Sequence, residues 1–447
     1  MQPREAVLAT PELLSLVFAF LPPDSRLLCR EVSTLWRRLL RDPERCWTVL
    51  DFSDTVREVD EPLLEAAAAA AAGRIHTLVS PASRKLWDDE FNPTSALGPV
   101  LLRVLRDNAA SLRRVRSYRY GDESGNAWYY GDLVNAQVAG ILEAAPALEL
   151  LETRLCGFDT ASSLLILRDE RVRLDAFMLC LEEVLDRPQV HELLTAIARQ
   201  RRTLRSIATQ SVPVHLAADA FVAVLCDCPH LTRCEIGHTT ISSDTLAALG
   251  RLLGAGLLLD LDLEECEAAP DLWTSRTAAL AFAAGLRANR RITDLSFGFT
   301  DIFGRRGSVG AEATVLSSMV AHPSLKFVRV SDQGDFPRTV PGFVTTWLSA
   351  VVTANSPLGH IHADLHLSEE DVLPFYSALG SNTRLHSITA PGRNMSAGFL
   401  REVVLPAVTA NTSLETIWVP EDLALTSNRL TRHQFIEWIT ALVNARS

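Results

Sequence analysis

Apolar residues recur along this chain in a unit that combines two periods. From residue 60 onward, a leucine or isoleucine is followed by mostly apolar residues three and five positions later, and then by a stretch with apolar residues at helical spacing. The clear copies begin at Leu204, Leu231, Leu258, Ile292, Leu325, Leu358, Leu385 and Leu414, and weaker copies at Ile75, Leu112, Leu148 and Leu174. Because side chains alternate in a strand and recur every 3.6 residues in a helix, each copy predicts a short strand followed by a helix.

The repeats begin 26 to 37 residues apart, which is the spacing of a solenoid whose neighbouring repeats complete each other's core. The pattern resembles leucine-rich repeats of the ribonuclease-inhibitor-like type. Asparagines stand three residues before the first leucine or isoleucine of four copies, as that type often shows: Asn289, Asn355, Asn382 and Asn411. Asparagine is largely missing after the strand, where these repeats usually keep one, so we expect less regular strands. A stack of purely helical repeats is the alternative fold.

The residues before the repeats predict three short helices. Thr10 suits an N-cap, Pro11 suits the first helical position, and two prolines at 22–23 end the first helix. The first helix carries its apolar residues on one face, and two shorter segments with Leu27, Val32 and Trp36 follow. About forty residues bury too little apolar surface to be stable alone, so part of this surface is expected to meet another chain.

Residues 8–51 resemble the F-box. The resemblance rests on Pro-x-Leu-Leu at 11–14, Phe-x-Phe-Leu-Pro-Pro at 18–23 and Leu-Trp-Arg-Arg-Leu-Leu-Arg-Asp-Pro at 35–43. Thr10 and Ser33 replace the leucine and the cysteine usual in the family. The resemblance implies binding to a Skp-type adaptor, and through it to a cullin, in a ubiquitin ligase. The residues expected to contact the adaptor are Pro11, Leu13, Leu14, Val17, Phe18, Leu21, Leu27, Val32 and Trp36.

These patterns predict an α/β protein in which a three-helix F-box module precedes a curved leucine-rich-repeat solenoid. We assign residues 1–52 to the adaptor-binding module, 53–73 to a helical junction and 74–447 to the solenoid. The junction contains an alanine run that ends before Gly73. Phe435, Trp438, Ile439 and Leu442 give the last segment an apolar face, so we expect a helix there that caps the solenoid.

Composition limits the partners and the compartment. The chain has 447 residues and a formal net charge of −11, which argues against nucleic-acid binding. The N-terminus lacks a signal-peptide pattern, and no run of about eighteen uncharged apolar residues suggests a membrane span. Eight scattered cysteines fit reduced thiols better than a disulfide framework. We therefore expect a cytoplasmic or nuclear protein without a membrane partner.

Acidic residues gather at alternate positions of three successive strands. If the repeat leucines point into the core, Asp260, Asp262, Glu264 and Asp294 point to the concave side and favour a target protein with a basic segment. A solvated strand face shows the same alternation. The competing target-binding candidate is a loop rich in tyrosine, tryptophan and glycine that contains Tyr118, Trp128 and Tyr129.

Two groups of residues have metal-ligand types at short spacing, namely Cys226, Cys228, His230 and Cys234, and His360, His362, Asp364 and His366. Cys234 falls on a core position, and same-face strand residues lie too far apart for four of them to share one metal, so we expect neither a metal nor a cofactor. Phosphate-binding loops, nucleophile elbows and zinc-protease helices are also absent from the sequence. We therefore predict a non-catalytic substrate-recognition subunit of a ubiquitin ligase; the alternative is a leucine-rich-repeat scaffold or inhibitor protein.

Overall fold

The structure is a computed structural model, and it divides into two compact units. It describes residues 11–40, 46–52, 61–81, 98–118, 133–181, 183–263, 266–269, 275–298, 309–331, 342–353, 356–364, 368–389, 395–418 and 429–446. Unit 1 comprises residues 1–183 with 202–204, and unit 2 comprises residues 184–201 with 205–447.

Unit 1 begins with three short helices, α2 (Pro11–Phe20), α3 (Pro23–Cys29) and α4 (Thr34–Leu39). Ser33 caps α4, because its hydroxyl accepts a hydrogen bond from the backbone N–H of Trp36 at 3.1 Å. The rings of Phe18 and Trp36 pack edge to face with centroids 5.3 Å apart. Trp47 is fully buried, and its indole N–H donates to the carbonyl of Leu40 at 2.7 Å. The three predicted helices are therefore present and close around a small aromatic core.

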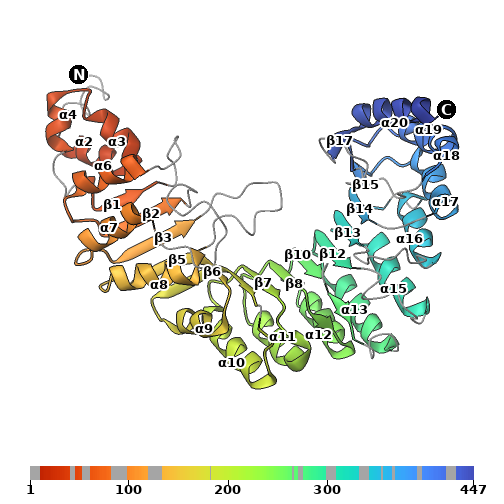
Figure 1. Cartoon of the computed structure of the whole chain (residues 1–447), viewed down its shortest axis with the longest axis horizontal. Coiled ribbons are helices and arrows are strands. Elements are labelled where there is room, and N and C mark those ends of the chain that lie inside the picture. The colour runs from red at the N-terminus through yellow and green to blue at the C-terminus, as the bar shows by residue number, and fades with distance from the viewer. Residues whose placement is uncertain are drawn as a thin grey trace. The chain divides into compact units, whose positions relative to one another are not determined.

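The rest of unit 1 alternates strands and helices (Figure 1). Its elements are β1 (Val49–Asp51), α6 (Glu61–Ala71), β2 (Thr77–Pro81), α7 (Pro99–Asp107), β3 (Arg114–Tyr118), β4 (Leu133–Val134), α8 (Asn135–Ala144), β5 (Leu150–Gly157), α9 (Thr160–Arg168) and β6 (Val172–Cys180). Strands β1, β2, β3, β5 and β6 form a parallel sheet in that order, and β4 also pairs with β5. The first strand thus lies inside the range assigned to the adaptor-binding module.

Unit 2 repeats the same alternation more regularly. Its strands are β7 (Ser206–Gln210), β8 (Arg233–Gly237), β9 (Thr240–Ile241), β10 (Asp260–Leu263), β11 (Glu267–Ala268), β12 (Asp294–Gly298), β13 (Phe327–Ser331), β14 (His360–Asp364), β15 (Ser387–Thr389), β16 (Thr416–Trp418) and β17 (Arg429–Thr431). Its helices are α10 (Arg187–Ile197), α11 (Ala218–Cys226), α12 (Ser243–Gly254), α13 (Arg276–Ala288), α15 (Val309–Val320), α16 (Gly342–Thr353), α17 (Glu369–Leu379), α18 (Ala397–Phe399), α19 (Leu405–Ala410) and α20 (Arg432–Arg446), with short 3-10 helices η1 (Ala198–Gln200) and η2 (Val214–Ala217) and a π-helical turn η4 (Leu400–Val404).

The main sheet of unit 2 lies on one side and the helices lie on the other (Figure 1). Strands β7, β8, β10, β12, β13, β14, β15 and β16 are parallel neighbours, and β17 pairs antiparallel with β16. The leucine or isoleucine that opens each clear repeat is at most 3 % exposed. The prediction of an α/β fold with strand–helix repeats, as in a leucine-rich-repeat solenoid, is confirmed, because purely helical repeats would have no such sheet.

Four buried polar side chains hold the turns between a helix and the next strand of unit 2. Three are asparagines that the sequence singled out, Asn289, Asn382 and Asn411. In each, the side-chain oxygen accepts hydrogen bonds from backbone N–H groups two and three residues later, and the side-chain nitrogen donates to a carbonyl of the preceding repeat. The fourth asparagine of the pattern, Asn355, lies outside the described residues.

His322 occupies the equivalent position before Leu325 and reproduces this bonding with an imidazole. Its Nδ1 accepts from the backbone N–H of Ser324 at 3.4 Å and of Leu325 at 3.2 Å. Its Nε2 lies 2.9 Å from the carbonyl oxygen of Leu286 and 2.8 Å from that of Asn289, so the ring carries its proton on Nε2. We refer to Asn289, His322, Asn382 and Asn411 as the polar turn residues.

The C-terminal end of unit 2 is a long helix, α20, as the sequence predicts. Phe435 and Ile439 on this helix are 2 % and 0 % exposed, and Phe435 contacts the ring of Trp438 at 5.6 Å between centroids. The side chain of Leu442 is outside the described residues. That α20 closes the core as a cap remains a prediction.

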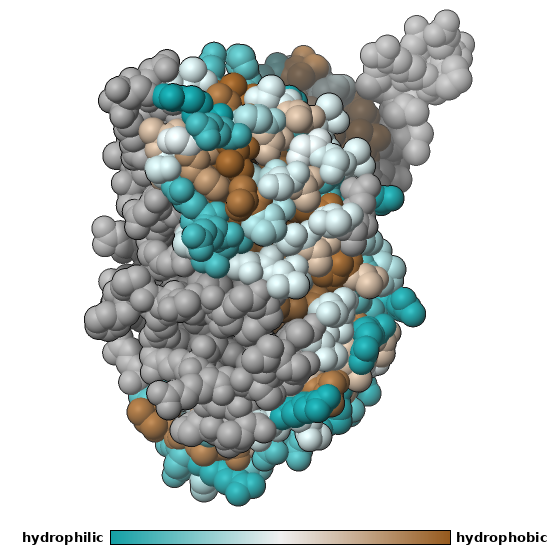
Figure 2. Space-filling view, turned by 90° about the vertical axis from the view of Figure 1, so that its right-hand side faces the viewer, coloured by the Kyte–Doolittle hydropathy of each residue, from teal (hydrophilic) through white to brown (hydrophobic). Residues whose placement is uncertain are grey.

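The described surface mixes polar and apolar residues. On the face shown in Figure 2, hydrophobic side chains occur in small groups between hydrophilic and intermediate ones. Among the described helices, none combines the length and the apolarity that crossing a membrane requires.

Candidate functional site

Some of the residues predicted to contact the adaptor lie in the core of the N-terminal module, and others lie on its surface. Leu14 and Phe18 are 2 % and 1 % exposed, so they belong to the core of the module in this structure. Val17 and Val32 are 44 % and 63 % exposed. Leu28, which is not among the predicted contacts, is 64 % exposed. Exposed leucine and valine on so small a module are available to a partner.

The other predicted contact residues are intermediate or outside the description. Leu21, Leu27 and Trp36 are half-buried. Pro11 and Leu13 lie at the start of α2, but the placement of their side chains is outside the described part of the chain. The exposed apolar residues that an adaptor could contact are therefore concentrated on α2, on α3 and on the turn that follows α3.

Arg26 on α3 is an interior residue that the sequence pattern does not predict. Arg26 is 2 % exposed, and its guanidinium donates to four backbone carbonyls, those of Ala19, Leu21, Cys46 and Val49. It also lies over the ring of Trp47, 5.6 Å from the centroid. Burial lowers the pKa of Arg26, opposed by the nearby Cys46 and Asp51. Arg26 thus ties the ends of the helices to the first strand of the sheet.

The second candidate site is the inner face of unit 2, which we define as the side of its main sheet opposite the helices. Two rows of side chains cross this face, because equivalent residues of neighbouring strands lie in register. The first row is Arg233, Asp260, Asp294, Phe327, His360, Ser387 and Thr416, and the second is Glu235, Asp262, Ser296, Arg329, His362, Thr389 and Trp418. Three of the acidic residues predicted to bind the target, Asp260, Asp262 and Asp294, therefore do lie on one face.

One arginine is placed among these carboxylates. Arg233 Nε lies 3.1 Å from Asp260 Oδ2, and Arg233 Nη2 lies 3.6 Å from Glu235 Oε2. Side-chain exposure is 29 % for Arg233, 25 % for Asp260 and 15 % for Glu235, so the pairs are largely withdrawn from solvent. Asp294 accepts a hydrogen bond from the hydroxyl of Thr293 at 2.5 Å. We call Glu235, Asp260, Asp262 and Asp294 the acidic cluster; Glu264, the remaining predicted acid, lies outside the described residues.

Two members of the acidic cluster, Asp260 and Glu235, hold their protons unusually tightly. Burial raises the pKa of Asp260 to about 7, and the charges of Asp262 and Asp294 act in the same direction against the opposing charge of Arg233. Burial and the charge of Asp262 likewise raise the pKa of Glu235 to about 7. Near neutral pH Asp260 and Glu235 are therefore partly protonated, and a cationic group brought against them would stabilise their ionised forms.

Farther along the same face, the acidic residues give way to aromatic and basic ones. Phe327 and Arg329 follow on β13, and His360 and His362 follow on β14. The rings of His362 and Trp418 meet edge to face with centroids 6.0 Å apart, although β15 lies between their strands. Thr389 on β15 is 5 % exposed. The inner face therefore has an acidic part on β8–β12 and an aromatic and basic part on β13–β16.

The aromatic loop that competes with the acidic cluster cannot be placed. Tyr118 ends strand β3, but its side chain, Trp128 and Tyr129 lie outside the described residues. Its role in target binding stays a prediction.

The cysteines considered as metal ligands occupy interior positions. Cys228 and Cys234 are fully buried, and Cys228 Sγ lies 3.2 Å from the carbonyl oxygen of Val224. Burial raises the pKa of Cys228 to about 11 and raises that of Cys234 further above its usual range. Zinc binds thiolates, which this environment disfavours. Within the described ranges, no three or more histidine, cysteine, aspartate or glutamate residues are grouped as metal ligands; His366 is outside them.

Comparison with protein-family models matches the F-box domain to residues 10–48. The chain therefore contains an F-box domain, as the resemblance of residues 8–51 predicted. Comparison with curated proteins gives no match.

Among the solved structures that are similar to this chain, three illustrate the low sequence identity of the likeness. A crystal structure of the Rad7 and Elc1 complex in yeast has a TM-score of 0.45 and 13 % identity, covering 95 % of this chain and 92 % of that chain. A Bacteroides fragilis protein has a TM-score of 0.36 and 12 % identity, covering 60 % of this chain and 71 % of that chain. An internalin (InlF) from Listeria monocytogenes has a TM-score of 0.32 and 9 % identity, covering 83 % of this chain and 85 % of that chain.

Proposed function

From a chain that joins an F-box domain to strand–helix repeats, we propose a substrate-recognition subunit of an SCF-type cullin-RING ubiquitin ligase that acts in the cytoplasm or nucleus. F-box domains bind Skp-type adaptors, so the module connects this protein through the adaptor to a cullin. The repeats capture the target protein. The observation that carries the proposal is the F-box domain at residues 10–48, and the exposed apolar side chains of that module support it.

The adaptor interface we propose centres on Val17, Leu28 and Val32. Each exposes more than two fifths of its surface in the isolated chain. Burying such side chains against a partner contributes about 25 cal/mol per Å² of apolar area. Leu14 and Phe18, on the same helix as Val17, are buried within the module, where Phe18 packs against Trp36.

The target interface we propose is the acidic cluster on the inner face of unit 2. Four carboxylates on neighbouring strands, two of them paired with one arginine, favour a lysine or arginine side chain, and they speed its approach electrostatically. The protein acts by holding its target near the ubiquitin-transfer machinery, which is a contribution of proximity rather than of bond chemistry.

Copurification with the adaptor and the cullin tests the first half of the proposal. We expect Leu28→Glu with Val32→Glu to abolish capture of both partners, because two charges would be buried at the interface. Replacing Leu13 and Val17 by charged residues should act in the same way. Leu165→Glu is the matched control, since Leu165 is 72 % exposed on α9, outside the F-box domain. Undiminished capture by the double variant would exclude this interface.

Absence of both adaptor and cullin from the wild-type complex would favour the alternative role as a scaffold or inhibitor protein. Proximity labelling with ligase activity blocked is the way to obtain the target for the second half.

Target affinity at two salt concentrations tests the acidic cluster. We expect Asp260→Lys with Asp262→Lys to weaken target capture and leave adaptor capture unchanged. Added salt should weaken the wild-type interaction, because the attraction that draws a cationic target toward the cluster through solvent is screened beyond about 10 Å at roughly 0.1 M ionic strength. Asp227→Lys, on an exposed aspartate after α11, is the control. Loss of binding only in Trp128→Ala, without salt dependence, would instead assign the target to the aromatic loop.

A further inference from the structure

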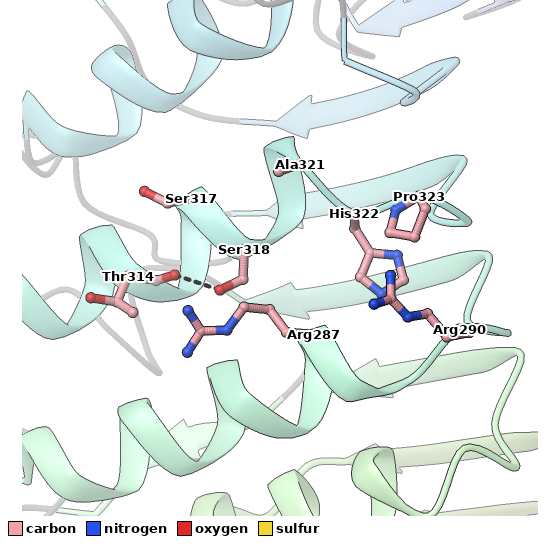
Figure 3. Close-up of a pocket in the computed structure, with 8 residues that line it drawn as sticks. All are labelled: Arg287, Arg290, Thr314, Ser317, Ser318, Ala321, His322 and Pro323. Carbon is pink, nitrogen blue, oxygen red and sulfur yellow. Dashed lines mark hydrogen bonds between the residues drawn. The ribbon is translucent and has the colours of Figure 1, made fainter.

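A pocket of about 550 Å³ opens on the helix side of unit 2, away from the inner face (Figure 3). It lies between the C-terminal ends of α13 and α15. The residues that line it are Arg287, Arg290, Thr314, Ser317, Ser318, Ala321, His322 and Pro323. Figure 3 shows the two arginines on the α13 side and the hydroxyl residues on the facing helix. None of the described residues that line the pocket is a carboxylate, so the charge of these residues is entirely positive.

The two arginines are uncommitted within the described part of the chain. Arg287 and Arg290 are exposed, and neither forms a hydrogen bond or ion pair with a residue that the structure describes. Arginines elsewhere in the same unit are engaged: Arg233 pairs with Asp260, and Arg251 pairs with Asp219. In a chain of net charge −11, two neighbouring arginines without an acidic partner among the described residues mark a place that suits an external anion.

The wall of the pocket is fixed by bonds that leave the arginines as its principal donors. His322 is 2 % exposed, and both of its ring nitrogens bond backbone groups of the turns. The hydroxyl of Ser318 donates to the carbonyl of Thr314 at 2.8 Å. Pro323 and Ala321 complete the wall with small or rigid side chains. A bound anion would therefore meet mobile guanidinium groups against a rigid surface.

We propose that this pocket binds a phosphomonoester group. Such a group carries a charge of about −1.5 to −2 at pH 7 and three strong acceptor oxygens, which match two guanidinium groups with their planar donor forks. A carboxylate carries one charge and is satisfied by one fork, so it leaves the second arginine unpaired. The cavity is much larger than a phosphate, so the group is borne on a larger body, either a protein side chain or a small molecule. This site is separate from the F-box domain and the acidic cluster, and it does not depend on the proposed function.

Calorimetric titration of the full chain with O-phosphoserine tests the proposal. We expect saturable binding that is weakened at least about 10-fold, or about 1.4 kcal/mol, in the double variant Arg287→Gln with Arg290→Gln. Arg276→Gln is the matched control, because Arg276 is an exposed arginine at the opposite end of α13, about 16 Å away. We expect this control to bind within about twofold of the wild type, and glutamate to bind at least about 10-fold more weakly than O-phosphoserine.

Comparison of a phosphoserine-centred peptide with O-phosphoserine distinguishes the source of the group. Tighter binding of the peptide than of O-phosphoserine supports a phosphomonoester on a protein. Equal binding of O-phosphoserine and the peptide supports one on a small molecule. Equal affinities of the double variant and the wild type, glutamate bound as tightly as O-phosphoserine, or no saturation up to about 10 mM would overturn the proposal. Melting temperatures of the variants show whether the arginines only stabilise the C-terminal end of α13. A lower melting temperature with unchanged binding would also overturn the proposal of a phosphomonoester site.

Discussion

The polar turn residues and the acidic cluster of unit 2 both place polar groups away from water, but the partners of these groups differ. Both are polar groups withdrawn from water. Asn411 is fully buried, and its side chain bonds two backbone N–H groups and two carbonyls, those of Leu379 and Asn382. Asp260 is three quarters buried, and its neighbours are other carboxylates and one arginine. The turns satisfy their polar groups with backbone donors and acceptors, whereas on the inner face like charges crowd together beside one arginine.

This difference separates residues that stabilise the fold from residues that are free to act on a partner. A buried polar group with a full set of hydrogen bonds contributes to stability, and a buried charge without compensation reduces it. A protein retains crowded like charges where something else gains from them. The contrast thus supports assigning structure to the turns and binding to the inner face, and three changes test it.

Replacing Asn411 by alanine should have the largest effect. The substitution leaves two backbone N–H groups and two carbonyls without their partner, so we expect the free energy of unfolding to fall by about 2–4 kcal/mol. Urea denaturation of the full chain measures it. Thr412→Ala is the matched control, since Thr412 is the exposed neighbour and should change stability by less than about 0.5 kcal/mol. Equal effects of the two substitutions would show that the turn bonds do not stabilise the repeats.

His322 should tolerate asparagine but not alanine. Asparagine offers one acceptor and one donor with the same roles as Nδ1 and Nε2, so we expect His322→Asn to lose less than about 1 kcal/mol and His322→Ala to lose about 2–3 kcal/mol. Thermal and urea unfolding of the two variants give the comparison. Equal losses would mean that the imidazole acts by filling space rather than by bonding the turns.

Asp260→Asn should have the smallest effect and the opposite sign. Because the pKa of Asp260 is raised to about 7 in the folded state, its contribution to stability is present below the unfolded pKa of about 4 and is lost as pH rises toward 7. Asparagine does not ionise, so the variant avoids this loss of stability, but it also lacks the ion pair with Arg233. At pH 8 we expect the variant to gain on the order of 1 kcal/mol over the wild type, with little or no gain at pH 4.5.

Urea unfolding of wild type and variant at both pH values measures this difference. Asp227→Asn serves as the control on an exposed aspartate of the same unit. A stability difference between wild type and variant that is the same at pH 4.5 and pH 8 would show that folding does not raise the pKa of Asp260.

The sequence predicted the repeats well because burial has a simple period. The leucine or isoleucine of each repeat, such as Leu231 or Leu385, is buried as alternation requires. His322 escaped the asparagine pattern, because residue identity alone does not reveal that an imidazole can supply the same donor and acceptor. Apolar spacing also could not separate Phe18, which is buried in the module, from Val17, which is exposed, since a core contact and a partner contact demand the same side-chain type. Arg26 was missed because its acceptors are backbone carbonyls far along the chain.

Arg26 also sets the moment during synthesis at which the F-box domain can fold. Its acceptors extend from Ala19 to Val49, so the buried guanidinium lacks part of its hydrogen bonding until Val49 has left the ribosome. A nascent chain that ends before residue 49 would bury this charge at a penalty, and its helices should stay loosely associated. For the same reason, a fragment cut at residue 48, where the family match ends, should be less stable than one that retains β1.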